Sequence, residues 1–393
     1  MKKSILVSMA FLMLSACIIY IPRTERDGYS YPRQEEYARR PPGSEVSEVY
    51  IYDYLSRYGG WVELAPYGYV WFPEDVPYGW RPYTRGRWVW TDYGWTWVSR
   101  YSWGWVPFHY GRWGWDDRLG WFWTVGTTWG PAWVTWRTGS RYIGWASLPP
   151  DVRFIPGYGI HRLSFNIPSS YWVFVEGSYF YSDRMDRYIL PPERNRRLIR
   201  TTVSRTEIIQ RDNRIINRGV DVDEIRRTSR SQVTKYQLED ATDLNPSRVE
   251  GNKVRMYRPA VERDPLARPS RIMEKQEALE VITRERIRKT QKDDEMDQRQ
   301  ERERELLEKT QEREIRDLKE KAEKTEKTGE RQETGKVTQE RIKELERDHK
   351  VEKSSLKKRQ AEETEKVKKS ESREKKEEEK KEKTGTTKKK KDL

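Results

Sequence analysis

Apolar and polar residues alternate with a period of two over short stretches in the first half of the chain. Trp88 and Trp90 are two positions apart, as are Trp95 and Trp97, so each pair lies on one face of a strand. Residues 92–94, Asp-Tyr-Gly, separate the two runs and contain typical turn residues. This pattern predicts an antiparallel β-hairpin with tryptophans on one face.

The same pattern returns 25 residues later, where Trp113 and Trp115 precede a turn and Trp121 and Trp123 follow it. Weaker copies occupy residues 60–71 and 133–145. A unit repeated at a constant spacing is typical of a structural scaffold. We therefore expect four successive hairpins.

The turns of the two strongest copies each contain an aspartate and a glycine at matching places. We expect the carboxylates of Asp92 and Asp117 to accept hydrogen bonds from the turn backbone. Gly94 and Gly120 are expected to adopt the positive φ that such turns require. Residues 171–181 predict one further hairpin that joins the same sheet.

The expected fold is mainly β. A flat open sheet would leave edges that promote aggregation, so the Trp-rich hairpins are expected to form one curled or closed sheet. A long charged C-terminal tail, helical or disordered, is expected to follow this sheet.

Paired prolines and changes in composition divide the rest of the chain. Residues 45–185 contain all eighteen tryptophans, and residues 186–270 predict a basic linker with short strands. Residues 271–393 lack aromatic residues and proline, and contain 40 Lys and Arg against 35 Asp and Glu. Such a segment buries little apolar surface, so an isolated charged helix or a disordered chain is expected. A coiled coil is the alternative, but the apolar residues are too sparse for sustained heptads.

The first residues predict export. Lys2 and Lys3 precede an apolar run that ends in Leu-Ser-Ala-Cys at the only cysteine, Cys17. Residues 1–16 thus resemble a bacterial lipoprotein signal peptide, which implies that Cys17 becomes the lipid-carrying first residue. Residues 17–44 would then form a polar tether. The residue after Cys17 is isoleucine rather than aspartate, which by this resemblance favours the outer membrane.

Several Trp- and Gly-containing segments resemble a Trp/Gly-rich bacterial family of unknown function, whose members are exported proteins and lipoproteins. The similarity extends over residues 45–260. The resemblance implies an exported location and no particular activity. Its most specific segments are 58–61, 80–83, 91–98, 129–134 and 144–150.

The tryptophans allow two interpretations. They form the core, or some of them are exposed and stack on sugar rings, as aromatic rows commonly do. Eight hairpin tryptophans are the candidate ligand-binding aromatics: Trp88, Trp90, Trp95, Trp97, Trp113, Trp115, Trp121 and Trp123.

The sequence predicts no catalytic site, metal site or cofactor. Its three histidines, His109, His161 and His349, lie in three different regions, and a lone histidine among aromatic residues is usually a packed side chain. An envelope hydrolase would need two close carboxylates. Those available are Glu63, Asp75, Asp92, Asp116 and Asp117.

The net charge of +14 predicts contact with polyanions. Outside the inner membrane these are cell-wall polymers and lipid headgroups rather than nucleic acid. We therefore expect a non-enzymatic envelope lipoprotein, attached to the membrane by its lipid, whose charged tail contacts anionic polymers or a protein partner. The alternative is a module that binds peptidoglycan or a surface polysaccharide through exposed aromatic side chains.

Overall fold

A computed structural model provides the structure of the chain. The residues that it describes are 45–152, 154–155, 159–160, 167–211, 214–229, 232–242, 247–292, 296–326 and 333–389. The predicted signal peptide, Cys17 and the tether lie outside these residues. Residues 40–393 form one compact unit, and all of the elements below belong to it.

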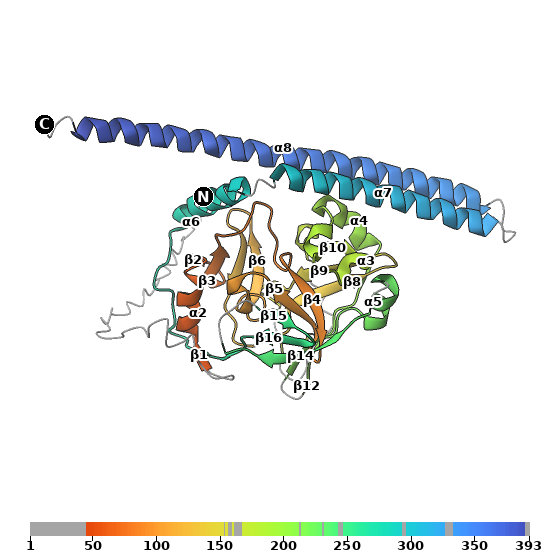
Figure 1. Ribbon diagram of the computed structural model, residues 1–393, viewed down its shortest axis with the longest axis horizontal. Coiled ribbons are helices and arrows are strands. Elements are labelled where there is room, and N and C mark those ends of the chain that lie inside the picture. The colour runs from red at the N-terminus through yellow and green to blue at the C-terminus, as the bar shows by residue number, and fades with distance from the viewer. Residues whose placement is uncertain are drawn as a thin grey trace, which may run out of the picture. The chain divides into compact units, whose positions relative to one another are not determined.

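Four consecutive β-hairpins form the first part of this unit, as the alternation predicts (Figure 1). Their strands are β2 (Gly59–Leu64), β3 (Gly68–Pro73), β4 (Gly86–Thr91), β5 (Gly94–Ser99), β6 (Arg112–Asp116), β7 (Gly120–Thr124), β8 (Val134–Thr138) and β9 (Tyr142–Ser147).

Tryptophans face one another across every hairpin. Trp88 is directly opposite Trp97, and their ring centroids are 4.9 Å apart. The corresponding pair in the first hairpin is Trp61 and Trp71. Cross-strand aromatic contacts of this kind contribute roughly 0.5–1.5 kcal/mol beyond the burial of area. The remaining pairs are Trp90–Trp95, Trp113–Trp123, Trp115–Trp121 and Trp136–Trp145.

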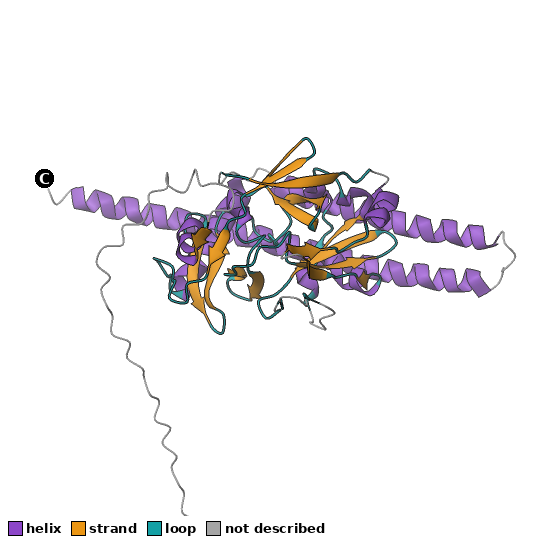
Figure 2. Cartoon of the chain, turned by 90° about the horizontal axis from the view of Figure 1, so that it is seen from below, coloured by secondary structure: helices purple, strands orange, loops and turns teal. Residues whose placement is uncertain are grey.

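The hairpins do not form the single curled or closed sheet that was expected. They belong to three sheets, with strand orders β2-β3-β7-β6, β10-β9-β8-β11 and β12-β13-β5-β4-β14-β16-β15. Figure 2 shows the strands in separate groups. Prolines such as Pro77, Pro107 and Pro131 interrupt the segments between hairpins, and a residue without N–H cannot extend a ladder. The third hairpin pairs with the first rather than with the second, β7 lying beside β3.

Strands from residues 186–270 complete these sheets. β14 runs parallel to β4, β13 meets β5 at Asn217 and Gly94, and β11 pairs with β8. The short strands expected in this region are thus present, and they pair with the Trp-rich hairpins. Their bounds are β11 (Val203–Ser204), β12 (Ile208–Arg211), β13 (Arg214–Asn217), β14 (Lys235–Asp240), β15 (Arg248–Glu250), β16 (Lys253–Met256) and β17 (Ala260–Glu262).

Residues 171–181 do not form the predicted hairpin. Only β10 (Val173–Glu176) is a strand, and it pairs with β9; α3 (Gly177–Phe180) follows it directly. Phe180 is fully buried and contacts Trp95 and Trp136, so its packing turns the chain inward.

Short elements connect the sheets. They are β1 (Glu45–Ser47), which pairs with β17, α2 (Glu48–Leu55), α4 (Asn195–Arg200), α5 (Val222–Ser229) and the 3-10 turns η1 (Ser102–Trp105), η2 (Ser169–Tyr171), η3 (Met185–Tyr188) and η4 (Pro192–Arg194).

The charged tail is helical where it is described, and it is not isolated. α6 (Lys275–Lys292) covers the first sheet, where Ala278 and Ile282 pack against apolar residues of β2, β3 and β7. α7 (Met296–Glu326) and α8 (Glu333–Lys389) lie antiparallel and side by side (Figure 1). Leu307 of α7 and Leu356 of α8 are both buried, whereas Val337 and Val351 of α8 are exposed.

Buried indoles also connect the hairpins to distant segments. Fifteen of the eighteen tryptophans are buried. Many donate their N–H to a backbone carbonyl elsewhere: Trp71 to Leu55 at 3.0 Å, Trp95 to Val220 at 2.8 Å and Trp145 to Tyr83 at 3.1 Å. An indole thus adds one directional bond to a large apolar area.

Asn217 is the acceptor in one such contact. Its Oδ1 accepts from Trp136 Nε1 at 2.7 Å, and its Nδ2 donates to the carbonyls of Ala132 and Val134. The side chain is completely buried. Asn217 therefore joins β13 to the fourth hairpin through a satisfied polar network.

We expect Trp136→Phe to destabilise the protein more than Trp97→Phe. Both changes shrink a fully buried ring, but only Trp136 donates a hydrogen bond, whereas Trp97 Nε1 has no partner among the described residues. Leaving Asn217 Oδ1 without its donor should cost an additional 1–3 kcal/mol, roughly, of unfolding free energy. Denaturant unfolding of both variants measures the difference, and equal losses would contradict this role of the indole N–H.

Candidate functional site

The structure buries most of the tryptophans that the sequence nominated as ligand contacts. Six of the eight are at most 3% exposed: Trp88, Trp95, Trp97, Trp113, Trp121 and Trp123. Trp90 is half-buried, and Trp115 is 44% exposed. The six buried rings form the scaffold, and they present no row of indoles to a ligand.

The hairpin turns use the predicted glycines but different polar side chains. Gly94 and Gly120 have φ of 80° and 76°, the left-handed conformation that the turns require. The turn amides bond instead to the side chains that end the preceding strands, Thr91 and Asp116. Thr91 and Asp116 lie next to the turn N–H groups, and they accept the hydrogen bonds of those groups. Asp92 pairs with Lys235, and Asp117 accepts from Trp115 Nε1.

The histidine and carboxylate candidates do not meet in one cleft. His109 is buried, bonds to the Gly130 carbonyl at 2.9 Å and stacks on Trp129. Burial lowers the pKa of His109 to about 4, so the ring is neutral at pH 7. His161 lies outside the described residues. Of the five carboxylates, Glu63 is in β2, Asp75 follows β3, Asp116 ends β6, and Asp92 and Asp117 are in hairpin turns. In the described ranges, no three His, Cys, Asp or Glu side chains are arranged to hold a metal ion.

A basic cleft is a large hollow lined by many charged side chains. Its volume is about 850 Å³, and it lies between the loop after β3, η3 and the helices α6 and α7. Trp80 and Tyr101 form part of its wall, together with Leu190 and Leu306. Eight cationic side chains line it: Arg81, Arg85, Arg100, Arg184, Arg187, Lys289, Arg299 and Arg302.

Among the described residues, Asp186 and Glu303 are the carboxylates that line the same cleft. Asp186 forms ion pairs with two arginines, Arg100 at 3.0 Å and Arg184 at 3.7 Å. The guanidinium of Arg85 lies over the ring of Tyr101, with its Cζ 5.2 Å from the centroid. Among the described lining residues, cationic side chains thus outnumber carboxylates, although Lys289 also pairs with Asp75 and Arg299 with Glu363 outside the lining.

Arg81 lies at the inner wall, where it donates to the Trp172 carbonyl at 2.5 Å. Burial, together with the positive charge of Arg359, lowers the pKa of Arg81 to about 10. The lowered value shows that its cationic form is less well solvated than in water. An anion in the cleft would compensate this charge.

A buried ion cluster holds the helical wall of the cleft in place. Glu314 of α7 accepts hydrogen bonds from Arg194 at 2.6 Å and from Arg197 at 2.9 Å. Glu352 of α8 accepts from Arg197 at 2.8 Å, and His349 lies 2.8 Å from Glu314. All five side chains are at most 10% exposed. Two arginines of η4 and α4 thus bind both tail helices at once.

Most of the polar groups in this cluster have hydrogen-bond partners. Tyr142 donates to Glu314 at 2.5 Å, and Gln311 donates to Glu352 at 2.8 Å. Burial opposes ionisation of Glu314, but the hydrogen bond to His349 and the two guanidinium groups outweigh it. They hold the pKa of this carboxyl well below its usual range. Buried charges are stable only when they are paired in this way.

Further ion pairs surround the cluster. Arg313 of α7 pairs with the buried Glu176 at 2.5 Å, and Arg359 of α8 pairs with Glu193 at 2.6 Å. The charge pattern of the tail therefore matches the surface that it covers.

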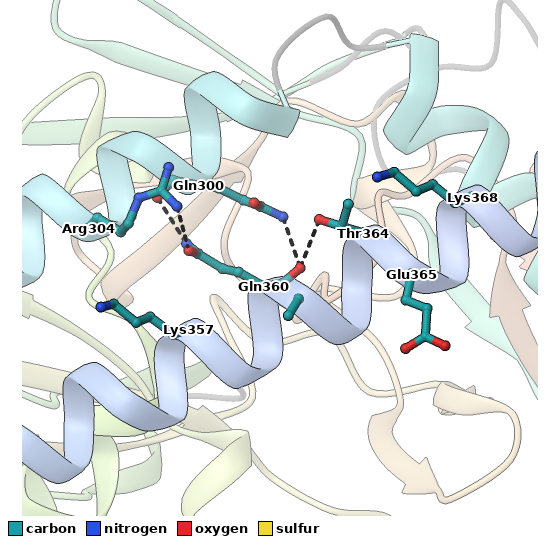
Figure 3. Close-up of a pocket in the computed structure, with 8 residues that line it drawn as sticks. Gln300, Arg304, Lys357, Gln360, Thr364, Glu365 and Lys368 are labelled. Carbon is teal, nitrogen blue, oxygen red and sulfur yellow. Dashed lines mark hydrogen bonds between the residues drawn. The ribbon is translucent and has the colours of Figure 1, made fainter.

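Between α7 and α8, glutamines occupy places where a coiled coil would have leucines. Gln360 Nε2 donates to the Gln300 carbonyl at 2.9 Å, and Arg304 donates to Gln360 Oε1 at 3.3 Å (Figure 3). A hollow of about 480 Å³ lies beside them. Gln300, Arg304 and Gln360 bond to one another across the two helices, and such a polar contact specifies how the helices pair.

Sequence reasoning missed both the cleft and the ion cluster. Arg81, Arg85 and Arg100 belong to the tryptophan repeat, whereas the other cationic groups come from the segment of η3 and from α6 and α7. Arg194 and Glu314 are 120 residues apart, and no spacing in the chain relates them. An excess of arginine in residues 186–200 was the one available signal.

Residues 52–152 match the model of a family of unknown function, DUF6600. The match spans the four hairpins, so the resemblance to a Trp-rich family of unknown function is confirmed there. The chain matches no curated protein and no solved structure. Helices α2 to α8 are all too short or too polar to span a bilayer.

We expect Glu314→Gln to weaken the docking of α7 and α8 strongly. The change leaves Arg194 and Arg197 buried with less than their full counter-charge, which typically costs about 3–5 kcal/mol. Hydrogen exchange of α7 measures the loss. Glu305→Gln is the matched control, because Glu305 forms only an exposed pair with Lys309 on the same helix. Equal protection of α7 in the two variants would refute the role of the cluster.

The lowered pKa of Glu314 predicts that the folded protein loses stability in acid. The pKa of Glu314 in the folded protein is far below its ordinary value of 4.5, so its contribution to stability is complete above that value. It declines as the pH falls below 4.5 toward the folded pKa. The unfolding free energy of the wild type should therefore fall more steeply between pH 4.5 and pH 3 than that of Glu314→Gln. Parallel curves would contradict this assignment.

Proposed function

We propose that the chain is a non-enzymatic binding protein of the bacterial cell envelope whose basic cleft holds an anionic group of an envelope polymer. The observation that carries the proposal is the composition of the cleft, with eight cationic side chains and two carboxylates around about 850 Å³. Arginine is well suited to bind phosphate and carboxylate, because its planar fork donates two parallel hydrogen bonds.

The location follows from the first residues of the sequence. A signal peptide at 1–16 and lipidation of Cys17 would anchor the chain, and the absence of aspartate after Cys17 favours the outer membrane. The anionic polymers within reach of such an anchor are lipopolysaccharide and peptidoglycan. A phosphate-bearing polysaccharide offers the multiple negative charges that this cleft would accommodate.

The tail takes part in this binding through its N-terminal half. Lys289 of α6 and Arg299 and Arg302 of α7 line the cleft, so the tail and the Trp-rich part form one binding surface. Removing the whole tail would also expose the apolar residues beneath α6. Point variants therefore test the proposal more sharply than truncation.

We expect the double variant Arg85→Gln/Arg187→Gln to bind lipopolysaccharide at least about tenfold more weakly than the wild type. Both side chains are exposed, and each can form charge-assisted hydrogen bonds to the ligand. A loss of about 1.4 kcal/mol of binding free energy raises Kd about tenfold. Binding measured by calorimetry should weaken further with added salt.

The control is Arg226→Gln/Arg255→Gln, which removes the same charge from exposed positions outside the cleft. Dephosphorylated lipopolysaccharide is the second control. Equal binding by both double variants would exclude the cleft, and equal binding of the dephosphorylated polymer would exclude phosphate recognition.

A further inference from the structure

A second hollow lies on a different part of the described structure, at the turn of the second hairpin. Its volume is about 470 Å³. It is bordered by Tyr93 in this turn, by Trp129 after β7, by Phe154 after β9 and by residues of β12, β13 and β14. None of the residues of the basic cleft lines it.

Two guanidinium groups converge on one ring in this hollow. Arg214 and Arg258 both lie over Tyr93, with Cζ 5.6 Å and 5.3 Å from the ring centroid. Arg258 also lies over Trp129, at 4.9 Å. A stacked guanidinium keeps the N–H groups of its edge available to an acceptor in the plane.

One carboxylate balances only one of these two charges. Asp240 at the end of β14 accepts from Arg258 Nε at 2.7 Å, and it is the one acidic side chain among the described residues of the lining. This ion pair fixes Arg258 over the two rings. The lining therefore has an excess of one positive charge, next to the exposed side chain of Arg214.

The remaining lining groups suit a hydroxylated ring. Phe154 and Ile215 provide apolar contact, and Thr128 and Gln210 provide a hydroxyl and an amide. Aromatic and aliphatic groups combined with a few polar groups are typical of small-molecule sites.

From this arrangement we propose that the hollow binds a saccharide ring that carries one carboxylate. The carboxylate pairs with the guanidinium of Arg214, and the ring lies against Phe154. This site is independent of the polymer-binding role of the basic cleft. It gives the protein a second, chemically different contact with a glycan.

N-acetylmuramic acid and N-acetylglucosamine test this proposal, because they differ by one lactyl carboxylate. Titration of the full chain by calorimetry should give a Kd for the acid at least about tenfold lower than for the neutral sugar. Arg214→Gln should raise the Kd of the acid about tenfold and leave that of the neutral sugar unchanged. Arg214→Lys should restore only part of the difference, because a lysine lacks the planar fork.

Arg218→Gln is the matched control, since Arg218 is exposed near the same strand and pairs with Glu207 outside the hollow. It should bind both sugars as the wild type does. Equal affinity for the two sugars, wild-type binding by Arg214→Gln, or no binding of either sugar at millimolar concentration would overturn the proposal. The cleft variant Arg85→Gln/Arg187→Gln should retain the preference for the acid. The experiment can therefore reject this proposal without rejecting the proposed function of the basic cleft, and the reverse.

Discussion

The indole side chain is the element on which the β part of this protein depends. Each hairpin places tryptophans opposite one another, so ring contacts hold the two strands together. The indole N–H then bonds to a carbonyl of another segment, as Trp123 does with Tyr110 and Trp133 does with His109. A leucine or phenylalanine core would supply the area without these bonds. Three small sheets, none of which closes on itself, are thereby fixed relative to one another.

Electrostatic pairing is the second interaction that determines the structure, because it positions the tail helices. The tail carries too few apolar residues to dock by burial alone, and its charges are complementary to those of η4, α4 and β10 instead. Two arginines, Arg194 and Arg197, meet Glu314 and Glu352 in a site closed to water. Such pairs contribute little while they are intact, yet they are costly to break, so they select one docked position for α7. The geometry of the basic cleft follows from that position, because α7 forms one of its walls.

The two proposed sites share a physical principle. In each, an arginine is stacked on an aromatic ring supplied by the Trp-rich part, Arg85 on Tyr101 and Arg258 on Tyr93 and Trp129. Stacking limits the freedom of a long side chain and leaves its hydrogen-bonding edge available. The rigid aromatic scaffold thus orients cations, and the number of cations around each hollow is the basis for proposing a polyanion at one site and a single carboxylate at the other.

The alternation of residues determined the four hairpins, their paired tryptophans and the positive φ of Gly94 and Gly120, because these depend on neighbours within about ten residues. The helical character of the tail was also accessible, since its charge pairs are local. The tertiary structure alone decided that the hairpins divide among three sheets and that the tail docks on them. Both depend on partners more than 100 residues apart, such as Trp95 with Val220 and Arg194 with Glu314. A local pattern contains no information about such partners, because burial and charge pairing arise only when the whole chain is packed.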